Sequence, residues 1–384
     1  MLTGQPNYPD GKVFSGFSAA TTTEEKHKDG YTIYRVPLIP RGRATVPRLI
    51  ANYVSFVISA TVFGPWLLRG AEFDVVFVYA PSPILQVIPA IVMKWLKRAP
   101  LVTWVQDLWP QSLESTGFVT NHHVLRLVER LVGWIYRRND FLLGQSRSFV
   151  TSIRKLSGRT PVEYFPNPGE GIPGEDQSTS SPALVLDPGF NVVFAGNLGT
   201  VQSLDTVLDA AELLRAERQI RFVLIGSGSR SGWLKSEVER RQLENVQLPG
   251  RLGADQMSGV MAQASVLLVS LIRSPIMSQT IPSKIQAYLA AARPIIASLD
   301  GEGAQVVIDA GAGVSVPAED ARALADAVLK VRALSDIERS RMGEAGARFY
   351  QRHFDPEVLA QQLIAHFRIV VNRDGGSAPL KASA

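Results

Sequence analysis

Residues 277–296 read Met-Ser-Gln-Thr-Ile-Pro-Ser-Lys-Ile-Gln-Ala-Tyr-Leu-Ala-Ala-Ala-Arg-Pro-Ile-Ile, and this stretch indicates both a fold and a binding site. Pro282 suits the start of a helix, where its missing N–H is not needed. Ser283 and Lys284 add a hydroxyl and an ammonium to the free N–H groups of the first turn, where the helix dipole favours an anion. An apolar strand follows the helix at once, over 295–297. This arrangement predicts a site for a nucleotide diphosphate.

The composition excludes several classes of site. The chain has 384 residues, which predicts two or three domains, and its 46% hydrophobic and 20% charged residues are ordinary for a globular protein. It has no cysteine, so disulfides, thiolate nucleophiles and cysteine-based metal sites are absent. The five histidines lack metal-ligand spacing, and no Asp-x-Asp pair occurs. We therefore expect no metal requirement and no cofactor.

Charge is distributed unevenly along the chain. Residues 1–165 hold 19 Lys/Arg and 11 Asp/Glu, a net +8, whereas residues 166–384 hold 21 and 24, a net −3; the sum is the +5 of the whole chain. A basic first half predicts an anionic partner, either membrane phospholipid, a lipid pyrophosphate or nucleic acid. Nucleic acid is least favoured because no aromatic-interleaved basic patch occurs. A basic soluble surface without a partner is the alternative.

Strand and helix patterns alternate along both halves of the chain, which predicts parallel sheets covered by helices. In the first half the predicted strands cover 31–38, 74–79, 101–105 and 141–144, and the predicted helices cover 83–97 and 121–138. In the second half the predicted strands cover 191–195, 221–225, 246–248 and 266–271, and the predicted helices cover 203–218, 229–242 and 255–264. A Gly/Pro/Ser-rich stretch at 170–182 predicts the linker between the halves.

The pattern Pro-Ser-Lys-x-x-x-Tyr-Leu-Ala-x-x-x-Pro at 282–294 resembles the donor-site helix of bacterial family-4 glycosyltransferases, in the branch that builds O-antigen, capsule and colanic acid. Five further segments match that branch in the same order, at 6–12, 107–110, 166–168, 194–199 and 222–228. The resemblance covers roughly residues 5–360. It implies an α/β fold of the GT-B type, in which two Rossmann-like domains face each other across a cleft.

The resemblance also implies domain boundaries. They are an acceptor-side domain at 1–168, a linker at 169–188, a donor-nucleotide domain at 189–358, and a crossover helix with a disordered tail at 359–384. Met1-Leu2-Thr3-Gly4 looks like the end of a strand, whereas the family begins with a strand, a Gly-containing loop and a helix. We therefore expect the first β-α unit to be missing. The N-terminus also lacks a signal-peptide pattern.

Residues 49–68 are twenty consecutive residues without a charge, between Arg48 and Arg69. This length suffices for a membrane span. Four polar residues and the pair Gly64-Pro65 argue against one. Three interpretations stay open: an interfacial helix that dips into the membrane, a buried helix, and a true span.

The resemblance assigns donor contacts with departures from the family pattern. Typical members hold the donor with an Arg and a Lys in the loop after the first strand of the second domain, where this chain has Asn197 and Gln202. They also use two glutamates, which align with Gln279 and Ala287. The available cations are Arg251, Arg273 and Lys284; for Lys284 the alternative is a solvated helix-start cation, although a lysine there opposes the dipole unless an anion binds. The donor-binding candidates are Gly196, Asn197, Leu198, Gly199, Arg251, Ser283 and Lys284.

On the first domain, the family's His-Asp pair is replaced by Gln106-Asp107. Asp107 follows a buried strand at the carboxyl edge, where open α/β sheets bind ligands. It is the candidate catalytic residue, to accept the acceptor hydroxyl's proton or bond a sugar hydroxyl. The alternative is that Asp107 caps a helix over 108–112. The candidates for acceptor or sugar contact are Gln106, Trp109, Glu114 and Gln279.

The resemblance implies a retaining glycosyltransferase that moves a sugar from a nucleotide-sugar, expected to be a UDP-sugar, to a polyprenyl-diphosphate-linked saccharide in surface polysaccharide biosynthesis. It implies a cytoplasmic enzyme associated peripherally with the inner face of the plasma membrane. Two alternatives stay open. One is an enzyme like UDP-N-acetylglucosamine 2-epimerase, which needs a cleft histidine that these motifs lack. The other is a catalytically impaired paralogue that only binds the sugar nucleotide.

Overall fold

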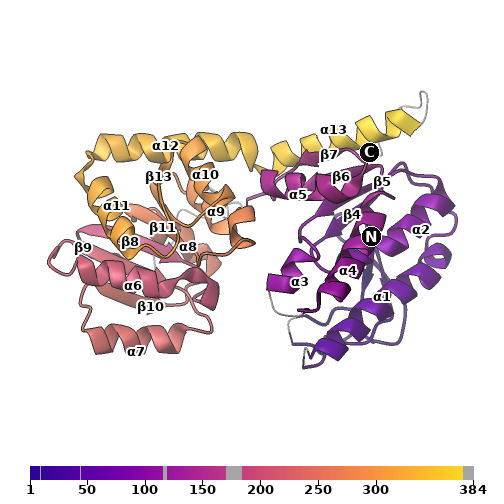
Figure 1. Cartoon of the computed structure of the whole chain (residues 1–384), viewed down its shortest axis with the longest axis horizontal. Coiled ribbons are helices and arrows are strands. Elements are labelled where there is room, and N and C mark those ends of the chain that lie inside the picture. The colour runs from indigo at the N-terminus through magenta and orange to yellow at the C-terminus, as the bar shows by residue number, and fades with distance from the viewer. Residues whose placement is uncertain (9, 44, 116–118, 170–183, 375–384) are drawn as a thin grey trace. The chain divides into compact units, whose positions relative to one another are not determined.

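The computed structural model describes residues 1–8, 10–43, 45–115, 119–169 and 184–374, and the chain divides into two compact units (Figure 1). Unit 1 comprises Met1–Gln145, Phe149–Phe165 and Leu363–Ala384. Unit 2 comprises Ser146–Ser148 and Pro166–Gln362. Most of the predicted linker and the whole of 375–384, where the disordered tail was expected, lie outside the described residues.

Unit 1 contains two sheets. The first has the order β1-β3-β2 and consists of β1 (Leu2–Gly4), β2 (Thr23–Lys26) and β3 (Thr32–Val36). The second is parallel, has the order β4-β5-β6-β7 and consists of β4 (Val76–Ala80), β5 (Leu101–Val105), β6 (Phe141–Gly144) and β7 (Val162–Tyr164). All five residues of β5 are buried, because β5 lies inside the sheet between β4 and β6. Its carboxyl end leads directly to Gln106 and Asp107.

Helices pack against the two sheets of unit 1. They are α1 (Val46–Leu67), the 3₁₀ turn η1 (Ile84–Gln86), α2 (Val87–Lys97), α3 (Gln111–Ser115), α4 (His122–Tyr136) and α5 (Arg147–Ser157). The helix α1 packs against β1 and β3, and α2 packs against β4 and β5. Asn121 caps α4, since its side-chain oxygen accepts a hydrogen bond of 2.8 Å from the backbone N–H of His123. Val132 and Ile135 on α4 pack with Val105 in the core of this unit.

Unit 2 is built on one six-stranded parallel sheet with the order β10-β9-β8-β11-β12-β13. Its strands are β8 (Phe190–Ala195), β9 (Ile220–Ile225), β10 (Val246–Gly250), β11 (Val266–Ser270), β12 (Ile295–Ser298) and β13 (Gly313–Val316). Numbered within the unit, the order is 3-2-1-4-5-6, which is the order of dinucleotide-binding sheets. The order reverses between β8 and β11, which pair at Val192 and Val266.

Helices and 3₁₀ turns connect these strands, and two long helices follow them. They are η3 (Thr200–Gln202), α6 (Leu204–Leu213), α7 (Ser231–Arg241), α8 (Ala254–Met261), η4 (Met277–Gln279), α9 (Ser283–Ala290), α10 (Glu302–Asp309), α11 (Ala321–Ala333), α12 (Asp336–His353) and α13 (Pro356–Asp374). A capping box starts α12, in which Ser335 and Glu338 bond each other's backbone N–H.

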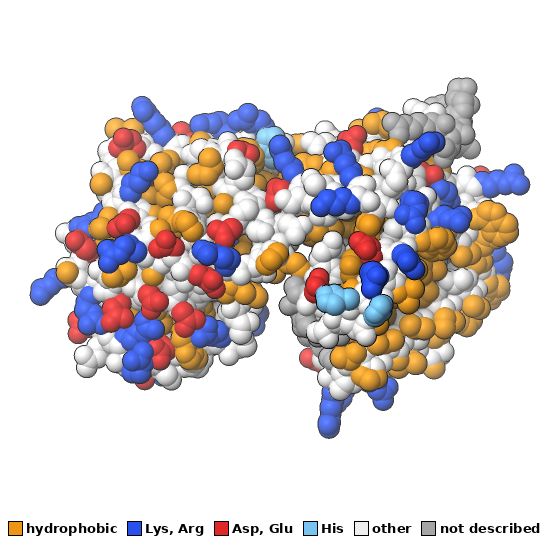
Figure 2. Space-filling model, viewed as in Figure 1, with side chains coloured by type: hydrophobic (Ala, Val, Ile, Leu, Met, Phe, Trp, Pro, Cys, Tyr) orange, Lys and Arg blue, Asp and Glu red, His pale blue; other side chains and the backbone are white. Residues whose placement is uncertain are grey.

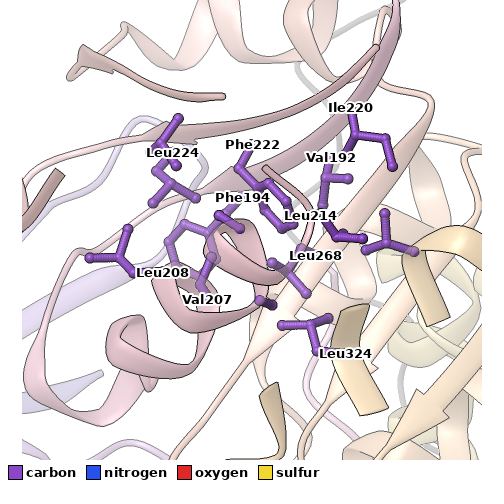
Figure 3. Packing of buried hydrophobic residues seen from close by; sticks show 14 of the residues in the cluster. Val192, Phe194, Val207, Leu208, Leu214, Ile220, Phe222, Leu224, Leu268 and Leu324 are labelled. Carbon is purple, nitrogen blue, oxygen red and sulfur yellow. The ribbon is translucent and has the colours of Figure 1, made fainter. Parts of the chain in front are cut away.

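The core of unit 2 lies between the sheet and the helices α6 and α11 (Figure 3). Phe194 from β8, Phe222 from β9 and Leu268 from β11 have no exposed surface. They meet Val207 of α6 and Leu324 of α11. Each such side chain contributes about 1.5–3 kcal/mol when fully buried. This core therefore fixes the position of β8, the strand that leads into the loop at 196–203.

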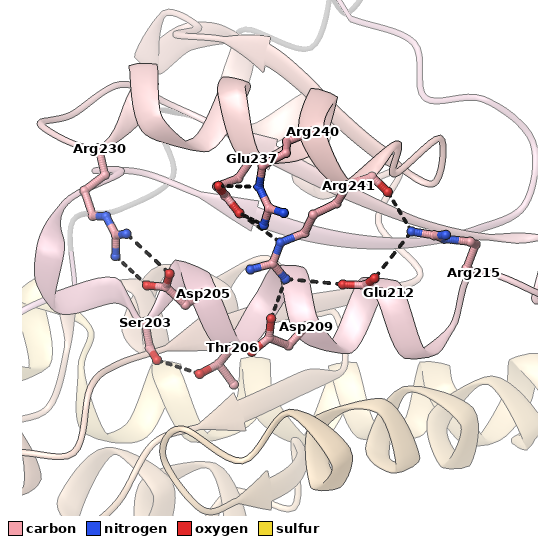
Figure 4. A network of polar contacts seen from close by, with 10 residues as sticks. All are labelled: Ser203, Asp205, Thr206, Asp209, Glu212, Arg215, Arg230, Glu237, Arg240 and Arg241. Atoms are coloured by element: carbon pink, nitrogen blue, oxygen red, sulfur yellow. Dashed lines mark hydrogen bonds and ion pairs between the residues drawn. The ribbon is translucent and has the colours of Figure 1, made fainter.

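Ion pairs join α6 to α7 on the surface of unit 2 (Figure 4). Arg230 pairs with Asp205, and Arg241 pairs with both Asp209 and Glu237. Hydrogen bonds from Arg240 and Arg241 lower the pKa of Glu237 to about 2. Exposed pairs of this kind each contribute little to stability.

The helix α13 belongs to unit 2 as far as Gln362 and to unit 1 from Leu363 onward. Within unit 1, the Phe367 and Phe77 rings meet edge to face with centroids 5.3 Å apart. The His366 ring lies 5.3 Å from that of Phe141, and burial lowers the pKa of His366. Aromatic contacts therefore hold the last turns of this helix on the core of unit 1.

Two predicted helix boundaries are wrong. The helix predicted over 203–218 ends at Leu213, because residues 215–219 form turns that lead into β9. The helix considered over 108–112 is not present in that register, because α3 begins at Gln111. The strands β2, β7 and β13 were not predicted, since each is only three or four residues long.

Candidate functional site

Two segments of unit 2 flank the point where the strand order reverses. The first runs from Gly196 to Ser203 after β8, and the second runs from Leu271 to Pro282 after β11. Open α/β sheets bind ligands at this position, outside the carboxyl ends of the strands. The candidate residues Gly196, Asn197, Leu198 and Gly199 lie on the first segment, and Ser283 and Lys284 follow the second. We call these two segments with the start of α9 the switch-point site.

The helix α9 begins at the switch-point site without a side-chain cap. Pro282 is its N-cap residue, with φ −60° and ψ 135°. Its side chain has no hydrogen-bonding group, so it does not cap the N–H groups of the first turn. Ser283, the first helical residue, is exposed. The uncapped N–H groups and the helix dipole together favour an anion at this end.

Lys284 extends from α9 across the end of β8. Its Nζ donates a hydrogen bond of 2.8 Å to Oε1 of Gln202 and lies 4.5 Å from the centre of the Phe194 ring. A Cβ placed on Gly196 would lie only 2.7 Å from the Lys284 Cε, so the lysine chain rests directly on this glycine. Burial lowers the pKa of Lys284 to about 8. No described carboxylate pairs with this ammonium, so its charge is available to an anion.

Tyr288 fixes α9 to the strand that carries the first segment. It lies four residues after Lys284, on the same face of the helix. Its buried hydroxyl accepts a hydrogen bond of 2.8 Å from the backbone N–H of Ala195 and lies 3.2 Å from the Ala195 carbonyl oxygen. Tyr288 and Lys284 therefore hold the start of α9 against the end of β8.

Close backbone approach shapes the first segment. Gly226 has φ +144°, and a Cβ there would lie 1.8 Å from the carbonyl oxygen of Gly196. The N–H of Leu198 donates to the carbonyl oxygen of Ser227 at 2.9 Å. Leu198 itself is buried in the core, whereas Asn197 is exposed. The loop is thus anchored by Leu198 and presents Asn197 outward.

The side chains of the other predicted donor and sugar contacts have different surroundings. Arg251 is exposed and follows β10, the edge strand two positions from β8. Arg273 pairs with Asp300 and donates to the Ala318 carbonyl oxygen at 2.9 Å. The Gln279 side chain donates to the carbonyl oxygen of Pro275 at 2.9 Å, within its own loop. Of the three cations considered from the sequence, Lys284 makes a side-chain hydrogen bond to the first segment, at Gln202.

Of the residues predicted to act on the acceptor or the sugar, Gln279 lies on unit 2, and the others follow β5 on unit 1. Asp107 accepts a hydrogen bond of 3.1 Å from Nε1 of Trp109. The interpretation that Asp107 caps a helix over 108–112 is wrong, because α3 starts four residues later, at Gln111. Glu114 on α3 is exposed. The structure therefore groups Asp107 with Trp109 and leaves Glu114 on the surface.

Two buried polar groups accompany this carboxylate. The Nε2 of Gln106 is buried without a hydrogen-bond partner among the described residues, as is the hydroxyl of Tyr136. Burial and the negative charge of Asp107 both raise the pKa of Tyr136. Buried polar groups usually have partners, so these two mark a polar place in an otherwise apolar core.

Within the described part of the chain, no three His, Asp or Glu side chains lie close enough together to hold a metal ion. The charged residues described at the switch-point site are Lys284 and Arg273, and Arg273 is paired with Asp300. The arrangement can bind an anion through one ammonium, the N–H groups of α9 and a hydroxyl.

The sequence matches two known families. Residues 9–168 match the "Glycosyl transferase 4-like domain", and residues 189–333 match the "Glycosyl transferases group 1". The chain belongs to the family of glycosyltransferases that these two domains define. WbjE of Pseudomonas aeruginosa, a probable glycosyltransferase, is 23% identical over 340 residues, which are 85% of this chain and 82% of that protein. WcaI of Escherichia coli K12, a putative colanic acid biosynthesis glycosyl transferase, is 25% identical over 308 residues, 76% of this chain and 72% of that protein.

Solved structures show the same fold. HepE of Anabaena, crystallised with UDP, superposes with a TM-score of 0.64 at 15% identity, over 80% of this glycosyltransferase and 82% of that chain. A trehalose-phosphate synthase from Burkholderia vietnamiensis superposes with a TM-score of 0.72 at 14% identity, over 98% and 94%. The α/β fold of the GT-B type is therefore confirmed. This protein is a glycosyltransferase of polysaccharide biosynthesis.

Three residues around the switch-point site were not assigned their roles from the sequence. Phe194 faces the ammonium, Gln202 accepts its hydrogen bond, and Tyr288 holds the helix. Tyr288 could have been found from its spacing of four residues from Lys284. Gln202 occupies the sequence position where the family has a basic residue. The structure shows that it accepts a hydrogen bond from a basic residue on α9, Lys284.

Proposed function

We propose that this glycosyltransferase moves a sugar from a UDP-sugar to a lipid-linked saccharide, with retention of anomeric configuration and without a metal ion. The observation that carries the proposal is the position of Lys284. Its ammonium lies beside Gly196 of the first segment, near the start of α9, which has no side-chain cap. Both lie where the strand order of the unit 2 sheet reverses, between β8 and β11. This is where a nucleotide diphosphate is bound in sheets of this order.

The choice of UDP is supported by a structural neighbour. HepE of Anabaena has been crystallised with UDP and with UDP-glucose. Its fold is shared at low identity, so the support concerns the kind of donor and not the sugar. We expect the uracil nucleotide at the carboxyl edge of the unit 2 sheet, with its diphosphate toward Ser283 and Lys284.

The chemistry asks the protein to stabilise a leaving diphosphate. As the glycosidic bond to the donor breaks, negative charge develops on the β-phosphate. Lys284 and the N–H groups of α9 are fixed donors that oppose this charge without first reorganising, since Gln202 and Phe194 already hold the ammonium. In this proposal the protein positions reactants and supplies no covalent nucleophile.

On unit 1 we assign the acceptor to the carboxyl end of β5. Asp107 would accept the proton of the attacking hydroxyl or bond a sugar hydroxyl, and Trp109 holds its carboxylate in place through Nε1. The net +8 of residues 1–165 supports an acceptor that carries a lipid diphosphate. Such an acceptor would place the enzyme at the cytoplasmic face of the membrane.

UDP release tests the proposal directly. The protein is incubated with UDP- and GDP-sugars, with and without a polyprenyl-diphosphate-linked saccharide extracted from membranes. Release of UDP that depends on acceptor and persists in EDTA is expected, with the product linkage retaining the donor configuration by NMR.

Other outcomes decide against it. Interconversion of UDP-N-acetylglucosamine without acceptor would indicate an epimerase instead. Binding of UDP without release from any donor would indicate an impaired paralogue. Loss of transfer in EDTA that added Mg²⁺ restores would disprove the metal-independent step.

A further inference from the structure

Six apolar residues form one exposed ridge along α1. They recur every four positions, and every one is exposed: Val46, Ile50, Val54, Ile58, Val62 and Trp66. Ile58 retains 58% of its accessible surface and Trp66 retains 56%. Residues spaced by four lie in one row on a helix surface. A soluble protein rarely leaves an apolar row of this length in water.

The opposite side of α1 is packed into unit 1. Its buried residues are Asn52, Ala60 and Gly64, which are also separated by multiples of four. A Cβ on Gly64 would lie 3.1 Å from the Leu2 side chain, and Asn52 donates a hydrogen bond of 2.7 Å to the Ile39 carbonyl oxygen. Because both rows follow the same spacing, the apolar ridge stays opposite the packed row between Asn52 and Gly64.

The middle and the end of α1 are tied to the same unit. In the middle, Ser55 accepts a hydrogen bond of 2.9 Å from the N–H of Ile39. At the end, Nζ of Lys97 on α2 donates to the carbonyl oxygens of Leu68 and Ala71, both at 2.7 Å. The helix is long and apolar enough to cross a membrane by length and composition. For α1 to cross a membrane, its packed side would have to leave unit 1. The hydrogen bonds at Ser55, Leu68 and Ala71 would also have to break.

Positive charge flanks the ridge. Residues 30–71 contain five arginines and no Asp or Glu, and Arg41, Arg43 and Arg48 precede or begin the helix. Arg69 follows it and stacks on Trp66, with 4.8 Å from the guanidinium to the ring centre. Trp95 at the end of α2 is also 79% exposed. Figure 2 shows hydrophobic side chains gathered over the part of unit 1 where α1 and α2 lie. Apolar residues with tryptophan and arginine at the margins fit the boundary between acyl chains and anionic headgroups.

We propose that α1 docks flat on a bilayer with anionic headgroups, with the ridge from Ile50 to Trp66 in the acyl boundary and the flanking arginines on the phosphates. At about 40° for each step of four residues, this part of the ridge spans about 160° of the helix surface, centred on Ile58. The helix lies in the membrane plane and does not span it. Of the three interpretations left open by the sequence, this one agrees with both the exposed row and the packed row. Membrane docking is separate from donor binding, and its test needs no substrate.

Vesicle co-sedimentation tests the docking. Wild type is mixed with vesicles of phosphatidylcholine alone and of phosphatidylcholine with phosphatidylglycerol, at low and high salt. We expect binding to the anionic vesicles that salt weakens but does not abolish. The double variant Ile58→Glu/Val62→Glu should bind roughly ten-fold or more weakly. Ile337→Glu, at a residue of α12 with 66% exposure on unit 2, is the matched control and should bind like wild type.

Labelled cysteines then separate docking from spanning. The chain has no cysteine, so Ile50→Cys, Ile58→Cys and Trp66→Cys each carry a single environment-sensitive fluorophore, and Ile337→Cys is the control. Positions 50 and 66 are about 24 Å apart along a helix axis. At about 100° per residue, positions 50 and 66 point about 80° to either side of position 58. A helix in the plane therefore places the label at 58 a few ångströms deeper than the other two. All three stay in the shallow layer that lipids spin-labelled near the headgroup quench, and the control stays in water.

Three results would overturn the proposal. One is a label at position 58 that lies at the bilayer centre, about 12 Å deeper than the labels at positions 50 and 66, which indicates a span. Another is equal vesicle binding by wild type and the double Glu variant, or binding by neither. The third is concentration-dependent dimerisation in buffer that shields the three labels without lipid, which assigns the ridge to a second copy of the chain.

Discussion

Replacing Lys284 by methionine should weaken UDP binding and remove a pH dependence that wild type shows. Methionine keeps an apolar chain of similar length over Gly196 and Phe194 but has no ammonium. A charged hydrogen bond contributes roughly 1.5–3 kcal/mol, so UDP affinity at pH 7 should fall about 10- to 150-fold. Lys235→Met, at an exposed position on α7 of the same unit, is the matched control and should leave affinity unchanged.

The pH dependence follows from the pKa of Lys284, which burial lowers to about 8. In the free protein the amine is largely protonated at pH 7, half protonated near pH 8 and mostly neutral at pH 9. A diphosphate stabilises the charged form, so bound UDP raises this pKa again. Affinity should therefore be level below about pH 7 and fall toward ten-fold per pH unit well above pH 8. At pH 8 binding should take up about half a proton.

The lowered pKa of Lys284 also makes the free energy of unfolding depend on pH. In the unfolded chain a lysine titrates near pH 10.4, so between about pH 8 and that value the unfolded state holds more protons than the native state. The free energy of unfolding should rise with pH across this window. The buried ammonium costs about 3 kcal/mol at pH 7, and about 2 kcal/mol of that cost should be recovered by pH 9.5. Lys284→Met should lack this rise, so its stability relative to wild type should decline with pH.

Calorimetry in two buffers of different ionisation enthalpy measures the proton uptake at pH 8. UDP itself carries no titrating phosphate there, since its last phosphate pKa is near 6. Chemical denaturation at pH 7 and pH 9.5 measures the stability term. The reasoning fails if wild type and Lys284→Met take up the same number of protons, or if their stability difference does not change with pH.

Three further substitutions have defined outcomes. Gly196→Ala should reduce UDP affinity about ten-fold or more, because a Cβ at φ +132° would lie 2.7 Å from the Lys284 Cε; an unchanged dissociation constant would contradict the contact. Tyr288→Phe should lower the free energy of unfolding by about 1–3 kcal/mol, since it removes the acceptor of the buried Ala195 N–H, and denaturation curves that coincide with wild type would count against this role. Asp107→Asn should slow sugar transfer while UDP affinity stays as in wild type; a lowered UDP affinity in calorimetry would place Asp107 at the donor instead.

The sequence predicts the buried parts of this fold better than its edges. The strands β5 and β6 occur at the predicted residues, because continuous apolar runs mark strands that are covered on both faces. β2 and β13 were missed, because each has only four residues and no fully buried position. Elements of this kind are defined by their partners in the sheet, which a local pattern does not contain.

The candidate site could be predicted in part. The start of α9 was found from Pro282, Ser283 and Lys284, whose residue types carry their chemistry locally. Arg251 was a weaker inference, since charge alone does not say which strand ends beside the site, and the structure places it after an edge strand. The bond from Lys284 to Gln202 joins residues far apart in sequence, so only the strand order reveals it.

The pairing of β8 with β11 has a consequence for how a nucleotide acts on the whole unit. The two halves of the switch-point site follow strands that meet only when Val192 and Val266 are in register. Local unfolding of either strand therefore separates the first segment from the start of α9. A bound nucleotide restrains this opening by mass action, adding about 2.7 kcal/mol at a ligand concentration one hundred times the dissociation constant. Saturating donor should thus protect the central strands of unit 2, and their amide hydrogens should exchange more slowly.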